Sequence, residues 1–202
     1  ILAIIGDLIS GYIHEELMEN NELSPTEATI KAYELVTAGV DFILKHGNFK
    51  KVVLVLNWGN HARTTQKKRI STGATNSFEW LMYHFIAQRY IGNPKVVIKI
   101  ADGYFNYLDV YSYVVRFHHG DFVRYAGGIG GIHIPLNKAI DKWNQMKKAD
   151  LDVLGHWHTR KSDRRYLING SLIGFNAYAI NIKAEFEEPQ QSFFLIHPNH
   201  CK

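Results

Sequence analysis

The stretch Val-Val-Leu-Val-Leu-Asn-Trp-Gly-Asn-His, residues 52–61, decides the fold. Its five leading residues are all apolar, which predicts a buried strand. Polar residues follow at once, and Gly59 lets the backbone turn sharply, so that Asn60 and His61 can point into one cavity. In α/β folds catalytic groups collect at the carboxyl ends of strands. The stretch therefore predicts an α/β fold with a functional loop directly after one of its strands.

Helix and strand patterns alternate on both sides of this stretch. Upstream, the apolar run 1–5 predicts a strand, and Ser24-Pro25-Thr26-Glu27 has the capping-box pattern that begins a helix, which Gly47 closes. Downstream, Asn76 with Glu79 predicts the start of a helix that ends near residue 90. An amphipathic helix is expected at 136–146, and further strands are expected at 96–100, 111–117, 153–154, 166–168, 178–182 and 193–196.

The order of these elements favours one architecture. Strands alternate with helices early in the chain and dominate late, which predicts an α/β domain whose two sheets pack between helical layers, a four-layer α-β-β-α sandwich. No internal repeat, low-complexity tract or Pro/Gly-rich linker divides the chain. We therefore expect a single domain over residues 1–202.

Composition excludes several classes of protein. The 202 residues are 46% hydrophobic and 21% charged, as in one ordinary globular domain. No apolar run approaches the ~18 residues of a membrane span, so no membrane partner is expected. The single cysteine, Cys201, excludes a disulfide scaffold and a four-cysteine zinc module, and a cytoplasmic location follows as the expectation. The net charge of +4 is compatible with a phosphate-bearing partner.

Four polar clusters, each containing a glycine, follow four of the expected strands. They are Gly6-Asp7, Gly59-Asn60-His61, His118-His119-Gly120-Asp121 and Gly155-His156-Trp157-His158. A carboxylate, an amide oxygen and imidazoles form a mixed oxygen and nitrogen donor set that suits manganese, iron or zinc. Two such ions ~3.5–4 Å apart can clamp a phosphoryl group and activate the attacking water.

Taken in order, Gly6-Asp7, Gly59-Asn60-His61, His119-Gly120 and Gly155-His156-Trp157-His158 resemble the second to fifth motifs of the calcineurin-like metallophosphoesterases. The resemblance spans roughly residues 1–175 and is strongest to phage and bacterial phosphoesterases of the DNA-repair exonuclease type. It implies a metal-dependent phosphodiesterase with two divalent metal ions, manganese being favoured over iron or zinc. It also implies in-line attack on phosphorus by a metal-bridging hydroxide.

The resemblance also assigns a role to each matching residue. Asp7 would bridge the two ions, and His158 would belong to the first metal site. The second site would be completed by Asn60, His119 and His156. His61 matches the histidine beside the scissile phosphate, where with Asp7 it would serve catalysis by protonating the leaving oxygen or stabilising charge. Of the adjacent pair His118 and His119, strand alternation directs His118 to the opposite side.

Two features depart from the family pattern. The family's first motif, Asp-x-His, supplies two more ligands to the first metal and occurs nowhere in these 202 residues. We expect an N-terminal truncation that removes it; the alternative is a chain that holds one metal well and the other poorly. Ala62 stands where many members carry an acidic residue, and Trp58 precedes the glycine, so both could change substrate fit.

Basic residues flank two of the motifs and suggest the substrate. One cluster follows His61 and the other follows His158; the proposed phosphate-binding residues are Arg63, Lys67, Lys68, Arg69, Arg160 and Lys161. Neutralising several backbone phosphates favours a polymer, and we expect DNA as the substrate. The alternative for these clusters is an ordinary solvated surface.

Two other functions are compatible with the same residues. One alternative is a phosphomonoesterase that acts on a protein or a nucleotide. A second is a non-catalytic nucleic-acid-binding module that lost the first metal site. Related nucleases often work as dimers, so a homodimer is an analogy rather than a derived property.

Overall fold

The computed structural model describes residues 1–125, 127–181 and 183–199, and Cys201 lies outside them. The chain divides into two compact units, Ile1–Asn106 and Tyr107–Lys202. We call them unit 1 and unit 2. The expectation of a single domain over 1–202 stays a prediction.

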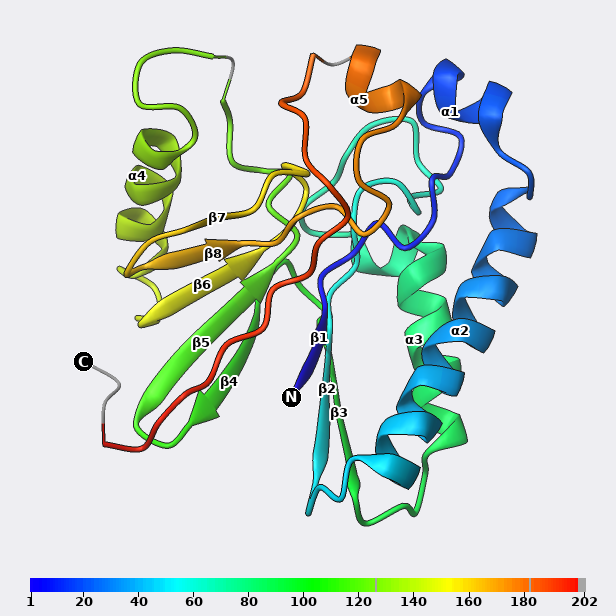
Figure 1. Ribbon diagram of the computed structural model, residues 1–202, viewed down its shortest axis with the longest axis vertical. Helices are drawn as coiled ribbons and strands as arrows, with labels where there is room; N and C mark the ends of the chain where they lie inside the picture. Colours follow the sequence, from blue (N-terminus) through cyan, green and yellow to red (C-terminus); the bar gives the residue numbers. More distant parts are fainter. Residues whose placement is uncertain (126, 182, 200–202) are drawn as a thin grey trace. The chain divides into compact units, whose positions relative to one another are not determined.

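Unit 1 is a parallel three-stranded sheet covered by helices. Its strands β1 (Leu2–Ile4), β2 (Val52–Leu56) and β3 (Val96–Ile100) lie in that order, with β2 in the centre. The helices α2 (Pro25–His46) and α3 (Phe78–Arg89) pack side by side on one face of the sheet (Figure 1). The short helix α1 (Glu15–Asn20) and the 3₁₀ turn η1 (Ala74–Asn76) complete the unit. Leu54, Val55 and Leu56 of β2 are fully buried and form the centre of its core.

Local chemistry explains where the two long helices begin and end. Ser24 caps α2 and forms the predicted capping box with Glu27. Gly47 ends α2 in a right-handed conformation, with φ at −80°, and donates its N–H to the Ile43 carbonyl. For α3 the expected start at Asn76 is wrong by one residue, because the Ser77 side chain accepts the Trp80 N–H and caps the helix.

Unit 2 is built on a mixed five-stranded sheet. Its strands are β4 (Asn106–Val110), which begins at the unit boundary, β5 (Tyr113–His118), β6 (Leu151–Leu154), β7 (Lys161–Ser162) and β8 (Tyr166–Ile168), and they lie in the order β4-β5-β6-β8-β7. Neighbours β5, β6 and β8 run parallel, and β7 is antiparallel to β8. The helices are α4 (His133–Trp143) and α5 (Ala177–Asn181). Leu136 and Ile140 of α4 pack with Leu154 and Ile168 in the core of this unit.

Three strand expectations in this half of the chain need correction. The strand expected at 111–117 begins two residues later, as β5, because the chain turns at Tyr111, whose φ is +57°; the strand β4 before this turn was not expected. The strand expected at 178–182 is helical over its described residues, because the Asn176 side chain accepts the Ala179 N–H and begins α5. Within the described part of 193–196 no strand is found, and the segment before it is held by side-chain bonds, such as that from the Ser192 N–H to Asn169.

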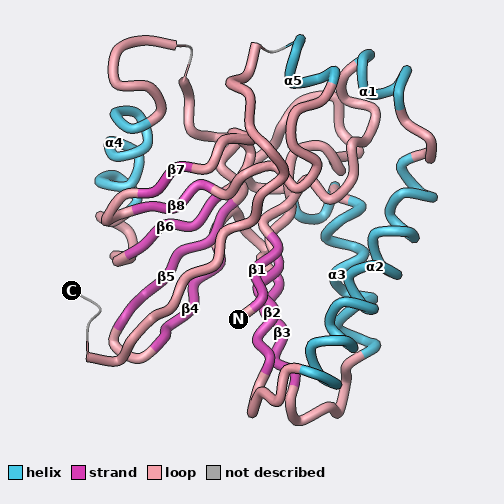
Figure 2. The backbone as a smooth tube through the Cα atoms, viewed as in Figure 1, coloured by secondary structure: helices cyan, strands magenta, loops and turns pink. Residues whose placement is uncertain are grey.

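The α/β class expected from the sequence is confirmed, since the structure has two sheets, each flanked by helices (Figure 2). The four-layer packing of those sheets stays a prediction. Among the described residues, no helix combines the length and the apolar character needed to cross a membrane.

Candidate functional site

Two loops leave the carboxyl edge of the unit 1 sheet and carry its predicted site residues. β1 and β2 are parallel with Ile4 opposite Leu56, so the segments that follow both strands start at the same edge. We call them the Asp7 loop (residues 5–14) and the Asn60 loop (residues 57–73). Figure 2 shows both as loop between strands and helices. The motif positions expected after the first two strands therefore lie where the sequence predicts.

The two loops meet backbone to backbone, and glycine is needed at the meeting point. A Cβ added at Gly6 would overlap the backbone of Gly59, and a Cβ at Gly59 would overlap the Asp7 carboxylate. Gly6 also has a φ of +90°, and Asp7 itself has a φ of +57°. This left-handed pair turns the chain sharply after β1 and directs the Asp7 side chain toward the Asn60 loop.

Asp7 and His61 face each other across these loops. The His61 N–H donates to Asp7 Oδ1 at 2.9 Å, and His61 Nε2 lies 3.7 Å from Asp7 Oδ2. His61 Nδ1 lies 2.9 Å from the Ser10 carbonyl oxygen. A carbonyl only accepts, so Nδ1 carries the proton in the neutral ring and Nε2 keeps its lone pair on the side of Asp7. Unit 1 thus brings Asp7 and His61 together, and buried Asn60 directly precedes His61.

His14 belongs to the same cluster, although no motif in the sequence places it there. Its ring lies 5.5 Å from the His61 ring, centroid to centroid. Burial, together with the charge of His61, lowers the pKa of His14 below its ordinary value of 6.5. Its one sequence signal is its place in the loop after the first strand, and a lone histidine there is weak evidence.

Glu79 is a second residue of the site that no sequence motif indicates. It lies in the first turn of α3, is fully buried, and accepts the N–H groups of Leu8 at 2.5 Å and Gly59 at 2.7 Å. The sequence pattern assigned it to the helix start, whereas Ser77 caps the helix and Glu79 reaches the two loops. The bond to Leu8 spans 71 residues, so no local pattern could reveal it.

Unit 2 places two predicted histidines together at the carboxyl edge of its sheet. β5 and β6 are parallel with His118 opposite Leu154, so His119 and the turn at 155–158 leave the sheet side by side. The Gly155 N–H donates to the His119 carbonyl at 3.0 Å. The rings of His119 and His156 lie 5.1 Å apart, with a ring nitrogen of one within 4.8 Å of a ring nitrogen of the other.

Strained backbone aims the imidazoles of the 155–158 turn. His156 and His158 both have left-handed backbone, with φ at +69° and +55°. The Trp157 N–H donates to the Gly155 carbonyl at 2.8 Å, which tightens the turn between them. His158 lies against Tyr178, with ring centroids 5.9 Å apart, and so points differently from His156, which pairs with His119. Such strain is held at functional sites more often than elsewhere.

His118 and His119 occupy different surroundings, in line with strand alternation. His118 is fully buried against Trp143 of α4, and its Nε2 lies 3.3 Å from Asp152 Oδ1. Arg116 donates to both oxygens of the same carboxylate, at 2.7 and 2.9 Å. Burial lowers the pKa of His118 below 6.5, with Asp152 opposing the shift. His119 instead pairs with His156.

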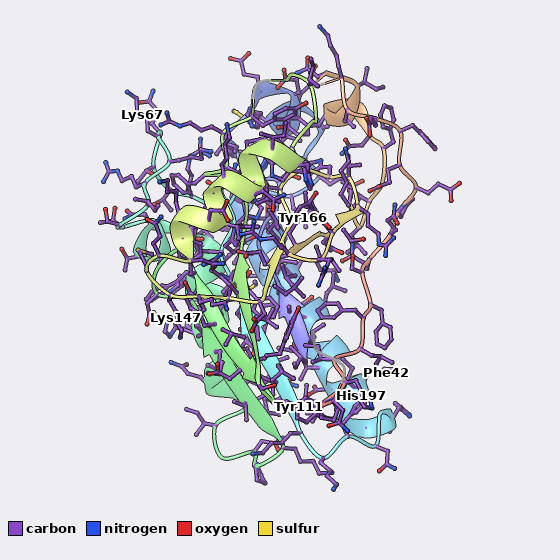
Figure 3. All side chains as sticks on the ribbon, turned by 90° about the vertical axis from the view of Figure 1, so that its left-hand side faces the viewer. Phe42, Lys67, Tyr111, Lys147, Tyr166 and His197 are labelled. Carbon is purple, nitrogen blue, oxygen red and sulfur yellow. The ribbon has the colours of Figure 1, made fainter. Side chains whose placement is uncertain are left out.

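The predicted phosphate-binding residues of unit 1 divide into two kinds. The Arg63 guanidinium donates to the carbonyls of Asn60, Thr65 and Gln66 and therefore shapes its own loop. Bonds from Thr64 N–H to Asn76 and from Phe78 N–H to Ala62 close the base of that loop. Three cations, Lys67, Lys68 and Arg69, are exposed beyond it, and Figure 3 shows Lys67 extending outward from this loop.

In unit 2 the predicted phosphate-binding residues are also exposed. Arg160 directly precedes β7 and Lys161 begins it, just after the histidine turn. The Arg160 N–H is bound by Glu187, and Lys161 Nζ is 3.8 Å from Glu185. The Arg160 backbone and the Lys161 ammonium therefore already lie near carboxylates from the C-terminal segment.

The donors present in each unit fit a divalent metal ion. Unit 1 offers a largely buried carboxylate at Asp7 and the amide oxygen of Asn60, and unit 2 offers the His119 and His156 nitrogens within 4.8 Å. Carboxylate, amide and imidazole groups together suit manganese, iron or zinc.

The similarity of this chain to known proteins lies at the level of structure. No family model matches this chain, and no curated protein matches it. The solved structures that are similar to part of it include the following two. One is a conserved uncharacterized protein, a predicted phosphoesterase, from Streptococcus pneumoniae TIGR4, at 14% identity and a TM-score of 0.31, covering 65% of this chain and 63% of that one. The other is a Vps29 single mutant from Entamoeba histolytica, at 11% identity and a TM-score of 0.34, covering 68% of this chain and 67% of that one. The chain thus spans less than two thirds of the length of the first structure.

Proposed function

We propose that this protein is a metal-dependent phosphoesterase that hydrolyses phosphodiester bonds, with DNA as its substrate. The observation that carries the proposal is that each unit gathers its share of the donors at the carboxyl edge of parallel strands: Asp7 and Asn60 in unit 1, His119 and His156 in unit 2. The motif order that resembles the calcineurin-like metallophosphoesterases supports the same assignment.

In this proposal the Asp7 carboxylate would be shared by two divalent metal ions, manganese being favoured. Asn60, His119 and His156 would hold one ion, and His158 would hold the other. When bound, the ions neutralise charge on the phosphoryl oxygens and activate the attacking water. The backbone strain at Asp7, His156 and His158 fixes these donors before the substrate arrives, so little reorganisation is needed during the reaction.

His61 is the proposed proton donor to the leaving oxygen. Its Nδ1 proton is held by the Ser10 carbonyl, which directs Nε2 toward Asp7. When the ring carries both protons, the transferable one is on Nε2, which lies 3.7 Å from Asp7 Oδ2. From that position Nε2 can deliver its proton as the ester oxygen leaves.

Hydrolysis of two model esters tests this function. Purified protein with manganese should hydrolyse bis(p-nitrophenyl) phosphate faster than p-nitrophenyl phosphate. Asp7→Asn should abolish both activities without lowering the helical circular dichroism signal, because it removes the charge but not the shape of the side chain. Faster hydrolysis of the monoester would show that the protein is a phosphomonoesterase and not a phosphodiesterase. Full activity in Asp7→Asn would refute the proposed site.

A further inference from the structure

Glu79 places a buried carboxylate between the two loops that carry the unit 1 donors. Its side chain comes from the first turn of α3, which covers the sheet, and its exposed fraction is 0%. One oxygen accepts the Leu8 N–H at 2.5 Å, and the other accepts the Gly59 N–H at 2.7 Å. These two N–H groups belong to the residue directly after Asp7 and the residue directly before Asn60.

A buried carboxylate destabilises the folded protein unless both of its oxygens accept hydrogen bonds. Burying an ionised group costs several kcal/mol when its hydrogen bonds are not replaced, so packing alone would favour an apolar side chain here. Hydrogen bonds from backbone N–H groups to a carboxylate are short and strong. Glutamine cannot replace them, because its amide offers one acceptor oxygen and turns an NH₂ group toward the second N–H.

We propose that Glu79 is a positioning residue that ties the Asp7 loop to the Asn60 loop and thereby sets the spacing of Asp7 and Asn60. The backbones of the two loops touch at Gly6 and Gly59, so a displacement of one loop also displaces the other. The His61 N–H bond to Asp7 Oδ1 then completes the arrangement. The consequence for metal binding rests on the proposed function, whereas the tie itself does not.

Amide hydrogen exchange tests the tie directly and needs no metal. In the wild-type protein the Leu8 and Gly59 amide protons should exchange slowly although both lie in loops. In Glu79→Gln at least one of them should exchange roughly tenfold faster or more, because a buried acceptor is lost. Fast exchange of both amides in the folded wild-type protein would overturn the proposal, and this measurement stands even if the variant fails to fold.

Tyr83→Phe is the matched control. Tyr83 lies one turn further along the same face of α3, is also fully buried, and donates its hydroxyl to the Asn57 carbonyl at 3.0 Å. Its replacement removes one buried hydrogen bond between α3 and the Asn60 loop but leaves the Leu8 and Gly59 N–H groups bound. We expect it to lower thermal stability without accelerating exchange at Leu8 or Gly59.

Manganese titration by calorimetry tests the consequence. Glu79→Gln should weaken manganese binding by about tenfold or more, as changes behind metal ligands commonly do, while Tyr83→Phe should leave it unchanged. At a fixed manganese concentration kcat should fall and added metal should restore it, with the KM for the diester unchanged, because Glu79 does not touch the substrate. Unchanged manganese binding in a folded Glu79→Gln protein would refute the positioning role. If the wild-type protein binds no manganese, the proposed function fails, and exchange at Leu8 and Gly59 still decides whether Glu79 ties the loops.

Discussion

At the scale of single residues, the absence of a side chain at Gly59 decides where Asp7 can lie. Any Cβ at that position would occupy the space of the Asp7 carboxylate. Glycine is thus needed at residue 59 because a side chain has no room there, and not because of an unusual backbone angle. By contrast, Gly39 in the exposed part of α2 has nothing within 4 Å of its would-be Cβ.

Gly59→Ala and Gly39→Ala should therefore have opposite effects. Gly59→Ala must displace Asp7 or the Asn60 loop, and we expect it to cost about 1–3 kcal/mol of the free energy of unfolding and to remove phosphodiesterase activity. Gly39→Ala should stabilise the helix by roughly 0.5–1 kcal/mol and leave activity intact. Urea unfolding and diester turnover measure both; an active, fully stable Gly59→Ala protein would contradict the crowded arrangement.

At the scale of elements, a polar cluster joins the ends of α2 and α3. Asp41 of α2 accepts the Tyr90 hydroxyl at 2.8 Å and Arg89 Nη2 at 2.8 Å. Asp41 and Arg89 are both exposed, so that ion pair contributes little. Tyr90 is buried, and burial together with the Asp41 carboxylate raises the pKa of its phenol to about 12.

This raised pKa predicts how stability depends on alkaline pH. The unfolded chain loses the Tyr90 proton near pH 10 and the folded protein near 12, so the stabilising contribution is complete below pH 10 and is lost as the pH rises from 10 to 12. The difference in unfolding free energy between the wild-type protein and Tyr90→Phe should shrink over that interval. Urea titrations at pH 9, 10 and 11 measure it, and a difference that stays constant would show that Tyr90 keeps an ordinary pKa.

The elements that the sequence predicts well are those whose signals are local. Apolar runs locate β2 and β3, and the capping box at Ser24 locates the start of α2. The turn at Tyr111, which separates β4 from β5, was not predicted because tyrosine is not a usual residue for a left-handed turn. The helix at 177–181 was missed because it depends on one side-chain bond from Asn176. The role of Glu79 depends on contacts with loops that are distant in the sequence.

At the scale of the whole molecule, charge distribution bears on the substrate. The net charge is +4, and Lys67, Lys68 and Arg69 are exposed at the end of a loop whose base is closed by backbone bonds. Arg63 shapes this loop from within, so the proposed contact with phosphates from this loop would involve the three exposed cations. Lys45, Lys50 and Lys51 are equally exposed but precede β2, at the opposite edge of the unit 1 sheet.

DNA binding should therefore depend on salt through one set of basic residues and not the other. Replacing Lys67, Lys68 and Arg69 by alanine should reduce the slope of log affinity against log salt concentration by about 2 for single strands and about 3 for duplexes. Replacing Lys45, Lys50 and Lys51 should leave the slope unchanged. Fluorescence anisotropy over a salt series measures both, and equal slopes in the two variants would show that the loop does not contact phosphates.

The buried ion pair between Arg116 and Asp152 has a consequence for the alignment of β5 against β6. These two residues are directly opposite in the parallel pairing, so the bidentate bond forms in only one alignment. A slip of β5 by one residue would separate the charges inside the protein and exchange the surroundings of His118 and His119. Arg116 and Asp152 thus stabilise one register of β5 against β6. They disfavour the misaligned sheet in which His118, and not His119, would meet His156.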